Sequence, residues 1–328
     1  MNKIRWGIIG CGDVTELKSG PAFNKVKNSE LVAVMRRNAE KAKDYAQRHD
    51  VPRWYTDANN LINDPEVNAV YVATPPSSHE EYTIAAVNAG KPVYVEKPMS
   101  VNARAAANMA TAAKKANQKL TVAHYRRAQP LFQKIKQLIT DKAIGETRFA
   151  RLSLYKPSLT QTEMQVEKTA WRIDPSFAGG GLFHDLSPHQ IDLMYYFFGE
   201  PLKAIGLANN QAGLYKADDI VSGNILFKNG VQFAGTWSFG ISAADDKDEC
   251  EILGSNGKII FSFFEHKPVT VITNGKAETY QFDPLRHVQQ PMIEKTVSYF
   301  LGEGPNPCSG EEGVQVMKVI DDFANKEE

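Results

Sequence analysis

The chain has 328 residues, 42% of them hydrophobic, and 38 basic side chains balance 38 acidic ones. This length predicts about two domains, and the zero net charge excludes a strongly basic nucleic-acid binder and a highly acidic disordered chain. Cys11, Cys250 and Cys308 are odd in number and far apart, which argues against a disulfide framework or a zinc site. The apolar runs are too short for a membrane span or an export signal, so we expect a cytoplasmic protein.

The first 124 residues alternate short apolar runs with helix-like stretches. Strands are predicted at 4–9, 31–35, 67–73, 92–95 and 120–123, and helices at 39–49, 78–88 and 100–117. Near-continuous apolar strands separated by helices are typical of a parallel sheet that helices cover on both faces. Residues 1–124 are therefore predicted to form a doubly wound α/β domain.

After residue 124 the pattern changes to alternating strand-like runs. Strands are predicted at 147–155, 204–209, 220–227, 231–239, 250–253, 258–263 and 269–273, helices at 131–138, 289–301 and 314–323, and a polar loop at 158–168. Asn-Gly pairs at 229–230, 256–257 and 274–275 supply the positive φ angles of tight hairpins. Residues 125–328 are therefore predicted to form a second α/β domain with a mainly antiparallel or mixed sheet.

A glycine-rich turn follows the first predicted strand. Gly10 and Gly12 permit a tight turn and the close approach of a pyrophosphate at a helix N-terminus. Thr15 replaces the third glycine or alanine of the dinucleotide fingerprint, so the motif alone also fits an ordinary strand–helix turn. Its position in a βαβ unit favours a dinucleotide site, to which we assign the following Asp13 and Val14 as well.

The second predicted strand ends at two arginines rather than at an acid. An enzyme that prefers NAD usually places Asp or Glu there, where the carboxylate binds both ribose hydroxyls. Arg36 and Arg37 instead suit the 2′-phosphate of NADP, which a guanidinium binds bidentately. We therefore expect NADP(H) to be preferred and NAD(H) to be possible; alternatively, both arginines are solvated charges.

Two further motifs end predicted strands. Thr74 and Pro75 follow the third strand with His79 nearby, and Glu96 and Lys97 follow the fourth. Ligands of open parallel sheets bind at the carboxyl ends of the strands, so we assign all five residues to the cofactor site. For His79 a structural role is the alternative.

Motifs in both halves of the chain resemble those of the Gfo/Idh/MocA oxidoreductase family. They are Gly7-Ile8-Ile9-Gly10-Cys11-Gly12, Ala73-Thr74-Pro75 with His79, Glu96-Lys97-Pro98, Trp171-Arg172 before Gly179-Gly180-Gly181, and Asp185-x-x-x-His189-x-x-Asp192. The resemblance implies a Rossmann domain, a second domain with a large open sheet, and reversible oxidation of a ring alcohol on a sugar or cyclitol. It also implies that Lys97, Asp185 and His189 are catalytic, and that the protein is a homodimer or homotetramer.

The chemistry of the same three side chains agrees with that implication. Hydride transfer from an alcohol requires a proton acceptor, and imidazole titrates near pH ~6.5, which suits His189. The ammonium of Lys97 stabilises a developing alkoxide. Asp185 lies four residues before His189, one helical turn away, although Ser187-Pro188 is typical of a helix start. A surface lysine and a structural histidine are the alternatives.

Aromatic and basic residues of both halves are candidates for the substrate. Aromatic faces suit the C–H face of a sugar ring, and arginine suits hydroxyls or a carboxylate. The candidates are Tyr125, Arg126, Arg127, Trp171 and Arg172, beside Asp185 and His189. Which of Arg126 and Arg127 faces the substrate stays open, as does the idea that residues 158–168 form a lid.

Three other functions compete with a dehydrogenase. A dinucleotide-sensing regulator would keep the fold without catalysis, although the presence of Lys97, Asp185 and His189 weighs against it. A redox-assisted glycosidase would hold NAD through turnover. A metal site on His184, Asp185, His189 and Asp192 would leave the nucleotide motifs unexplained, so we expect no metal.

Overall fold

The computed structural model describes residues 2–324 and divides the chain into two compact units. Unit 1 comprises Met1–Ala128 and Leu285–Val314, and unit 2 comprises Gln129–Pro284 and Gln315–Glu328. This division differs from a boundary at residue 124, because a late segment of the chain returns to unit 1. Within residues 2–324, every helix is too short or too polar to cross a membrane.

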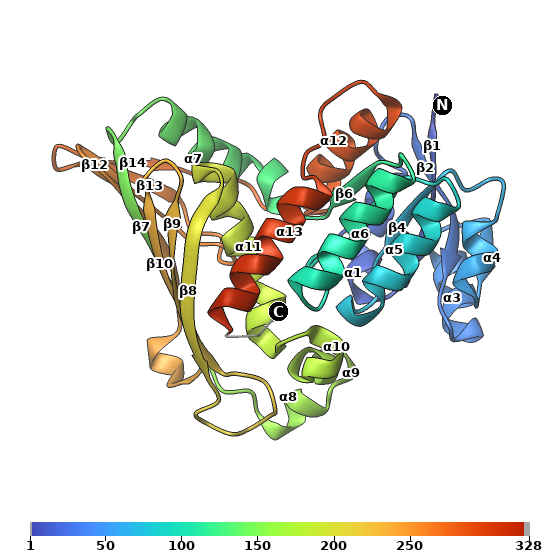
Figure 1. The fold of residues 1–328 in the computed structure, drawn as a ribbon, viewed down its shortest axis with the longest axis horizontal. Coiled ribbons are helices and arrows are strands. Elements are labelled where there is room, and N and C mark those ends of the chain that lie inside the picture. The colour runs from blue at the N-terminus through green and yellow to red at the C-terminus, as the bar shows by residue number, and fades with distance from the viewer. Residues whose placement is uncertain (1, 325–328) are drawn as a thin grey trace. The chain divides into compact units, whose positions relative to one another are not determined.

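Unit 1 contains the predicted parallel sheet, with six strands in the order β3-β2-β1-β4-β5-β6. Figure 1 labels β1, β2, β4 and β6 of this sheet. The strands are β1 (Ile4–Ile9), β2 (Ser29–Met35), β3 (Arg53–Tyr55), β4 (Ala69–Val72), β5 (Val93–Val95) and β6 (Leu120–Val122). The order reverses between β1 and β4, and ligands of doubly wound sheets bind at this switch point.

Helices cover both faces of this sheet. They are α1 (Asp13–Leu17), α2 (Gly20–Phe23), α3 (Ala39–Arg48), α4 (Ala58–Ile62), α5 (His79–Asn88), α6 (Ala103–Lys115) and α12 (Gln290–Leu301). Successive side chains of β1 point to opposite faces. Trp6 packs against Phe23 of α2 and Phe300 of α12, at ring centroid distances of 4.8 and 5.6 Å. On the other face Gly7 leaves room for Leu61 of α4.

The returning segment Leu285–Val314 is part of unit 1 rather than of the predicted second domain. The Val122 N–H of β6 donates to the Cys308 carbonyl at 3.0 Å. Buried Arg127 forms an ion pair with Glu312 at 2.6 Å. A helical pattern does not reveal which sheet a helix covers, so the sequence alone cannot assign this segment.

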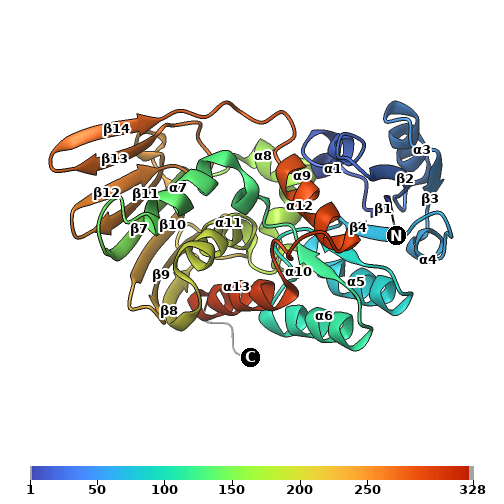
Figure 2. The ribbon, with the colours of Figure 1, turned by 90° about the horizontal axis from the view of Figure 1, so that it is seen from above.

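Unit 2 contains an eight-stranded sheet in the order β14-β13-β12-β11-β7-β10-β9-β8 (Figure 2). Its strands are β7 (Thr147–Pro157), β8 (Pro201–Asn209), β9 (Ile220–Phe227), β10 (Gln232–Ile241), β11 (Lys247–Gly254), β12 (Gly257–Phe261), β13 (Val269–Thr273) and β14 (Lys276–Tyr280). Within the described part of this eight-stranded sheet, only the β7–β10 pair is parallel, which confirms a mainly antiparallel sheet. All three Asn-Gly pairs lie between antiparallel neighbours; at 274–275 both residues have positive φ.

One face of this sheet is packed against helices. The helices of unit 2 are α7 (Pro130–Thr140), α8 (Gln161–Gln165), α9 (Glu167–Ala170), α10 (Pro175–Ala178), α11 (Gly181–Phe198) and the end of α13 (Gly310–Phe323). Phe183 of α11 and Phe323 of α13 contact Trp237 of β10, at centroid distances of 5.2 and 5.9 Å. Phe132 of α7 packs near Phe261 of β12.

Two local predictions in this unit are wrong. The expected loop at 158–168 contains α8 and the start of α9, because Thr160 and Glu163 form a reciprocal capping box. Ser187-Pro188 does not begin a helix: α11 runs from Gly181 to Phe198 and passes through Pro188. A proline removes only one backbone donor, and burial along most of α11 keeps the helix continuous.

Candidate active site

The glycine turn after β1 is fixed by its neighbours and open on one side. Gly10 has φ +96°, and a Cβ there would lie 2.8 Å from the Thr74 backbone nitrogen. A Cβ on Gly12 would meet little else than the Gly10 carbonyl oxygen at 3.9 Å among the described residues. The Thr15 hydroxyl donates to the Gly12 carbonyl at 2.8 Å, and Tyr45 donates to the Thr15 carbonyl at the same distance. Open space beside Gly12 fits the close approach of a pyrophosphate.

Arg36 lies beside this turn. It follows β2, and its Nη1 donates to the Cys11 carbonyl at 3.2 Å. Arg37 is exposed, as is Asp13, which begins the five-residue helix α1 with half-buried Val14. Of the two arginines, the structure therefore holds Arg36 against the predicted nucleotide turn. Burial raises the pKa of the Cys11 thiol to about 11, so this cysteine is protonated at neutral pH.

The turn after β4 is joined to the segment after β5 through His79. The buried imidazole lies 2.7 Å from the Thr74 carbonyl through Nε2 and 3.1 Å from the Pro98 carbonyl through Nδ1. Burial lowers the pKa of His79 to about 4. A neutral imidazole has one N–H, so it donates to only one of these carbonyls. The buried ring packs between Thr74 and the Lys97–Pro98 segment, which is a structural role.

A buried carboxylate network lies behind Lys97. Glu96 is 5% exposed and accepts from the Tyr71 hydroxyl, from Gln289 Nε2 at 2.6 Å, and from the Lys97 backbone N–H at 3.1 Å. Gln289 in turn accepts from the Tyr94 hydroxyl at 3.1 Å. Burial and the Glu96 carboxylate raise the pKa of Tyr71 well above its usual value, so its hydroxyl stays a donor. The sequence showed no pattern that singled out Tyr71 or Gln289.

In unit 2, Asp185 and His189 lie one turn apart on α11. His189 is 4% exposed, and Asp185 is partly exposed. The glycines before them allow α11 to begin at Gly181. Gly181 has φ +75°, and a Cβ on Gly180 would lie 2.0 Å from His184 Nδ1. The continuous helix therefore places both predicted catalytic side chains at a spacing of i and i+4.

Asp185 already has a cationic partner. Arg172 Nε donates to Asp185 Oδ2 at 3.0 Å. The guanidinium also lies over the Trp171 ring, 4.4 Å from its centroid, and donates to the Lys168 carbonyl. Three predicted site residues of this unit thus form one connected group: Trp171, Arg172 and Asp185.

The two arginines after β6 differ in environment. Arg127 is buried in its ion pair with Glu312, which is a structural role. Arg126 is partly exposed, and its guanidinium lies 5.7 Å from the ring centroid of buried Tyr125. Of the two side chains, Arg126 is the more exposed.

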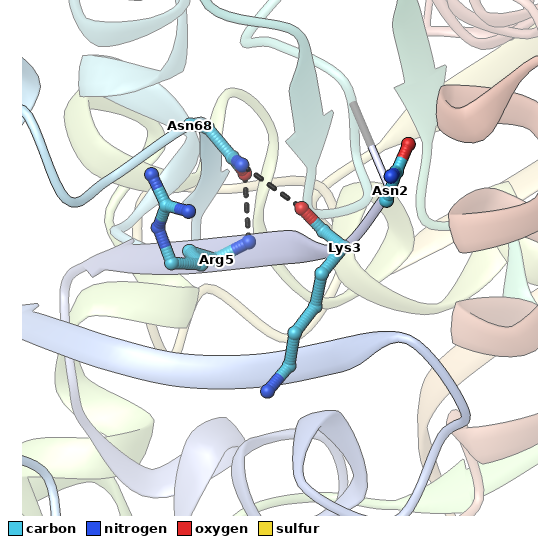
Figure 3. Close-up of a pocket in the computed structure, with 4 residues that line it drawn as sticks. All are labelled: Asn2, Lys3, Arg5 and Asn68. Carbon is cyan, nitrogen blue, oxygen red and sulfur yellow. Dashed lines mark hydrogen bonds between the residues drawn. The ribbon is translucent and has the colours of Figure 1, made fainter.

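A surface hollow of about 500 Å³ lies elsewhere in unit 1, lined by Asn2, Lys3, Arg5 and Asn68 (Figure 3). It is at the amino end of β1, whereas the nucleotide motifs are at the carboxyl end. Lys3 pairs with Glu30 at 2.6 Å, and Asn68 accepts from the Arg5 backbone N–H at 2.7 Å. These side chains already pair with one another and with Glu30 at the amino end of β1, away from the nucleotide motifs, so the hollow is not part of the active site.

Comparisons with known proteins agree with this geometry. Residues 4–124 match the model "Oxidoreductase family, NAD-binding Rossmann fold", and residues 132–260 match the GFO/IDH/MocA C-terminal domain. The chain is 50% identical over 326 residues to Oxidoreductase P35 of Formosa agariphila, covering 98% of each protein. It is 29% identical to 1,5-anhydro-D-fructose reductase of Ensifer adhaerens, covering 94% of this chain and 92% of the relative. A levoglucosan dehydrogenase in complex with NADH has the same fold, with a TM-score of 0.87 at 22% identity over 98% and 96% of the two chains.

The fold, the nucleotide turn and the family matches define a class, an oxidoreductase with an NAD-binding Rossmann domain. The chain belongs to the GFO/IDH/MocA family, which confirms the resemblance of its motifs.

Proposed function

We propose that the protein is an NADP(H)-dependent oxidoreductase that transfers a hydride between nicotinamide and a ring alcohol or ketone of a sugar, sugar derivative or cyclitol. The proposal depends above all on one observation: this family member has Lys97 after β5, and Asp185 and His189 one turn apart on α11. Relatives named for the reduction of 1,5-anhydro-D-fructose and the dehydrogenation of levoglucosan support a sugar-type substrate.

Each side chain has a defined part in the proposed reaction. When an alcohol carbon loses its hydride, the imidazole of His189 accepts the hydroxyl proton, and the same proton returns in reduction. Lys97 Nζ stabilises the negative charge that develops on the oxygen. Bound nicotinamide supplies the hydride acceptor or donor. Asp185 and Arg172 form a charge pair that orients substrate hydroxyls, with Trp171 and Tyr125 as apolar surfaces for the ring and Arg126 as a further donor.

The preference for NADP(H) depends on Arg36. Its guanidinium is held at the glycine turn through the Cys11 carbonyl, where the 2′-phosphate of the adenosine ribose would lie. We would titrate the purified protein with NADPH and NADH and follow cofactor fluorescence. Tighter binding of NADPH supports the proposal, and equal or tighter binding of NADH refutes it.

A panel of sugars and cyclitols with the preferred cofactor tests the reaction itself. Turnover of a ring alcohol that disappears in His189→Ala supports the proposal. Cofactor binding without turnover of any compound would favour a dinucleotide-sensing regulator. Dinucleotide that stays bound through purification, with glycoside hydrolysis, would favour a redox-assisted glycosidase.

We further propose that the protein is a homodimer or homotetramer built on the free face of the eight-stranded sheet. Edge strand β8 exposes Leu202, Ile205 and Leu207, the last of them 74% exposed. Exposed apolar rows of this kind are typical of protein interfaces. Light scattering of the wild type and of Leu207→Lys tests the proposal: a monomeric wild type refutes it.

A further inference from the structure

A carboxylate in unit 2, outside the predicted site, holds three consecutive backbone groups. Asp248 lies on β11 and is 1% exposed. Its Oδ1 accepts from the Phe263 N–H at 3.1 Å, and its Oδ2 accepts from the Phe264 and Glu265 N–H groups at 2.6 and 3.1 Å. Hydrogen bonds to an ionised acceptor are about twice as strong as neutral ones, so this carboxylate strongly fixes the conformation of residues 263–265.

The segment held in this way follows β12, which ends at Phe261. Ser262 Oγ donates to the Glu265 carbonyl at 2.7 Å and closes the turn from the other side. Since residues 263–265 lie outside the strands, they lack the regular ladder that would otherwise fix them. Asp248 therefore replaces a strand partner for this turn.

The two phenylalanines of the turn have different neighbours. Phe263 is buried and stacks near Phe132 of α7, at a centroid distance of 5.9 Å. Phe264 is partly exposed and meets the His189 ring edge to face, at 5.9 Å and an interplanar angle of 72°. The same carboxylate that orders the turn thus sets where an aromatic ring contacts the predicted acid–base catalyst.

We infer that Asp248 is a positioning residue for His189. It acts through the backbone of residues 263–265 and through the Phe264 ring, which limits the orientations open to the imidazole. Loss of the carboxylate releases the turn, and the ring contact is lost with it. The expected effect of Asp248 on turnover rests on the proposed acid–base role of His189. Its expected effect on the orientation of the His189 ring does not depend on that role.

The experiment compares Asp248→Asn, Phe264→Leu, the double variant, and the conservative Phe264→Tyr. Asp64→Asn is the matched control, because Asp64 is also buried and accepts the Glu66 N–H at 2.9 Å, but it lies in unit 1 beside the amino end of β4. One readout is the Cε1–H resonance of His189, assigned by its loss in His189→Gln. The other is the pair of constants kcat and KM for the substrate found in the panel, with KM for NADPH.

We expect Asp248→Asn and Phe264→Leu to move the His189 resonance in the same direction. Each should lower kcat on the order of tenfold without changing KM for NADPH, since sub-ångström misplacement of a catalytic group is costly. The double variant should be no worse than Phe264→Leu, and Phe264→Tyr and Asp64→Asn should resemble the wild type.

Two results would overturn the inference. One is an unchanged His189 resonance and kcat in Asp248→Asn; the other is additive losses in the double variant, because Asp248 would then act by another route. If Asp248→Asn does not fold, a wild-type resonance and kcat in Phe264→Leu overturn it equally. Full turnover in His189→Ala would instead refute the proposed function, while the resonance would still decide the positioning.

Discussion

The two units hold their predicted reactive groups in different ways. In unit 1 the groups lie on turns at strand ends, and Lys97 is supported by a buried carboxylate network that includes Gln289, 193 positions after Glu96. In unit 2 Asp185 and His189 share one helix, and their supports are a nearby ion pair and a turn between strands. Turns need distant contacts to become rigid, whereas a helix fixes the spacing of its own side chains.

This difference predicts which substitutions act on chemistry and which act on binding. Replacing either reactive group, Lys97→Ala in unit 1 or His189→Ala in unit 2, should lower kcat by about 10²–10⁴-fold, the usual contribution of acid–base catalysis. The dissociation constant of NADPH should change little in His189→Ala, because His189 is not among the residues assigned to the nucleotide site. Steady-state kinetics and a fluorescence titration check both expectations, and near-normal turnover in both variants contradicts the assignment.

The next largest effect should fall on cofactor selection in unit 1. Arg36→Asp removes the guanidinium beside the Cys11 carbonyl and introduces the carboxylate that would repel a 2′-phosphate. We expect NADPH affinity to fall at least ~10-fold, corresponding to the loss of one charge-assisted interaction, and NADH affinity to rise or hold. Arg37→Asp is the matched control, since Arg37 is exposed and should have a smaller effect.

Equal losses of NADPH affinity in the two arginine variants would mean that the combined positive charge of Arg36 and Arg37, rather than a contact of Arg36 alone, attracts the phosphate. That outcome would be resolved by the salt dependence of NADPH binding. Attraction between exposed charges weakens strongly above 0.1 M salt, whereas a direct bidentate contact weakens less.

A smaller effect should follow from the distant support of Lys97. Gln289→Leu removes one of the donors to the Glu96 carboxylate and leaves that charge less satisfied in a buried position. We expect kcat to fall on the order of tenfold and Tm to fall, with substrate KM nearly unchanged. Gln290→Leu is the control, because the neighbouring amide donates to exposed Glu294 instead. A loss of Tm with wild-type kcat would assign Gln289 to stability alone.

The same contrast explains how far sequence reasoning reaches. The parallel sheet, the hairpins at Asn-Gly pairs and the family motifs follow from local patterns: apolar runs, positive φ and short spacings. The helices at 161–165 and 167–170 had a local signal too, the Thr160–Glu163 capping box, which a search for polar loops overlooks.

Residues that support the site were beyond such patterns. Gln289 and Asp248 have no motif. Gln289 acts on Glu96, far away in the chain, and Asp248 acts on the turn at residues 263–265. Arg127 likewise has a structural role in its ion pair with Glu312. This role could not be predicted, because Glu312 belongs to the returning segment Leu285–Val314. Contacts of this kind depend on topology, which one sequence does not reveal.

The last expected effect is on folding stability rather than on turnover or cofactor binding, and it concerns the buried histidine His79 of unit 1. Burial lowers the pKa of His79 to about 4 in the folded protein, against about 6.5 in an unfolded chain. Between these values the unfolded chain binds a proton that the folded protein does not. The contribution of His79 is therefore complete above pH ~6.5 and is lost as the pH falls towards 4. Between pH 7.5 and 5.0 the loss of this contribution lowers the unfolding free energy by about 2 kcal/mol.

Urea unfolding at both pH values should show that His79→Gln loses less stability over this interval than the wild type. Some pH dependence should remain in the variant, because the pKa of buried His124 is also lowered. Equal losses in the two proteins would mean that burial does not keep the His79 ring neutral in the folded protein.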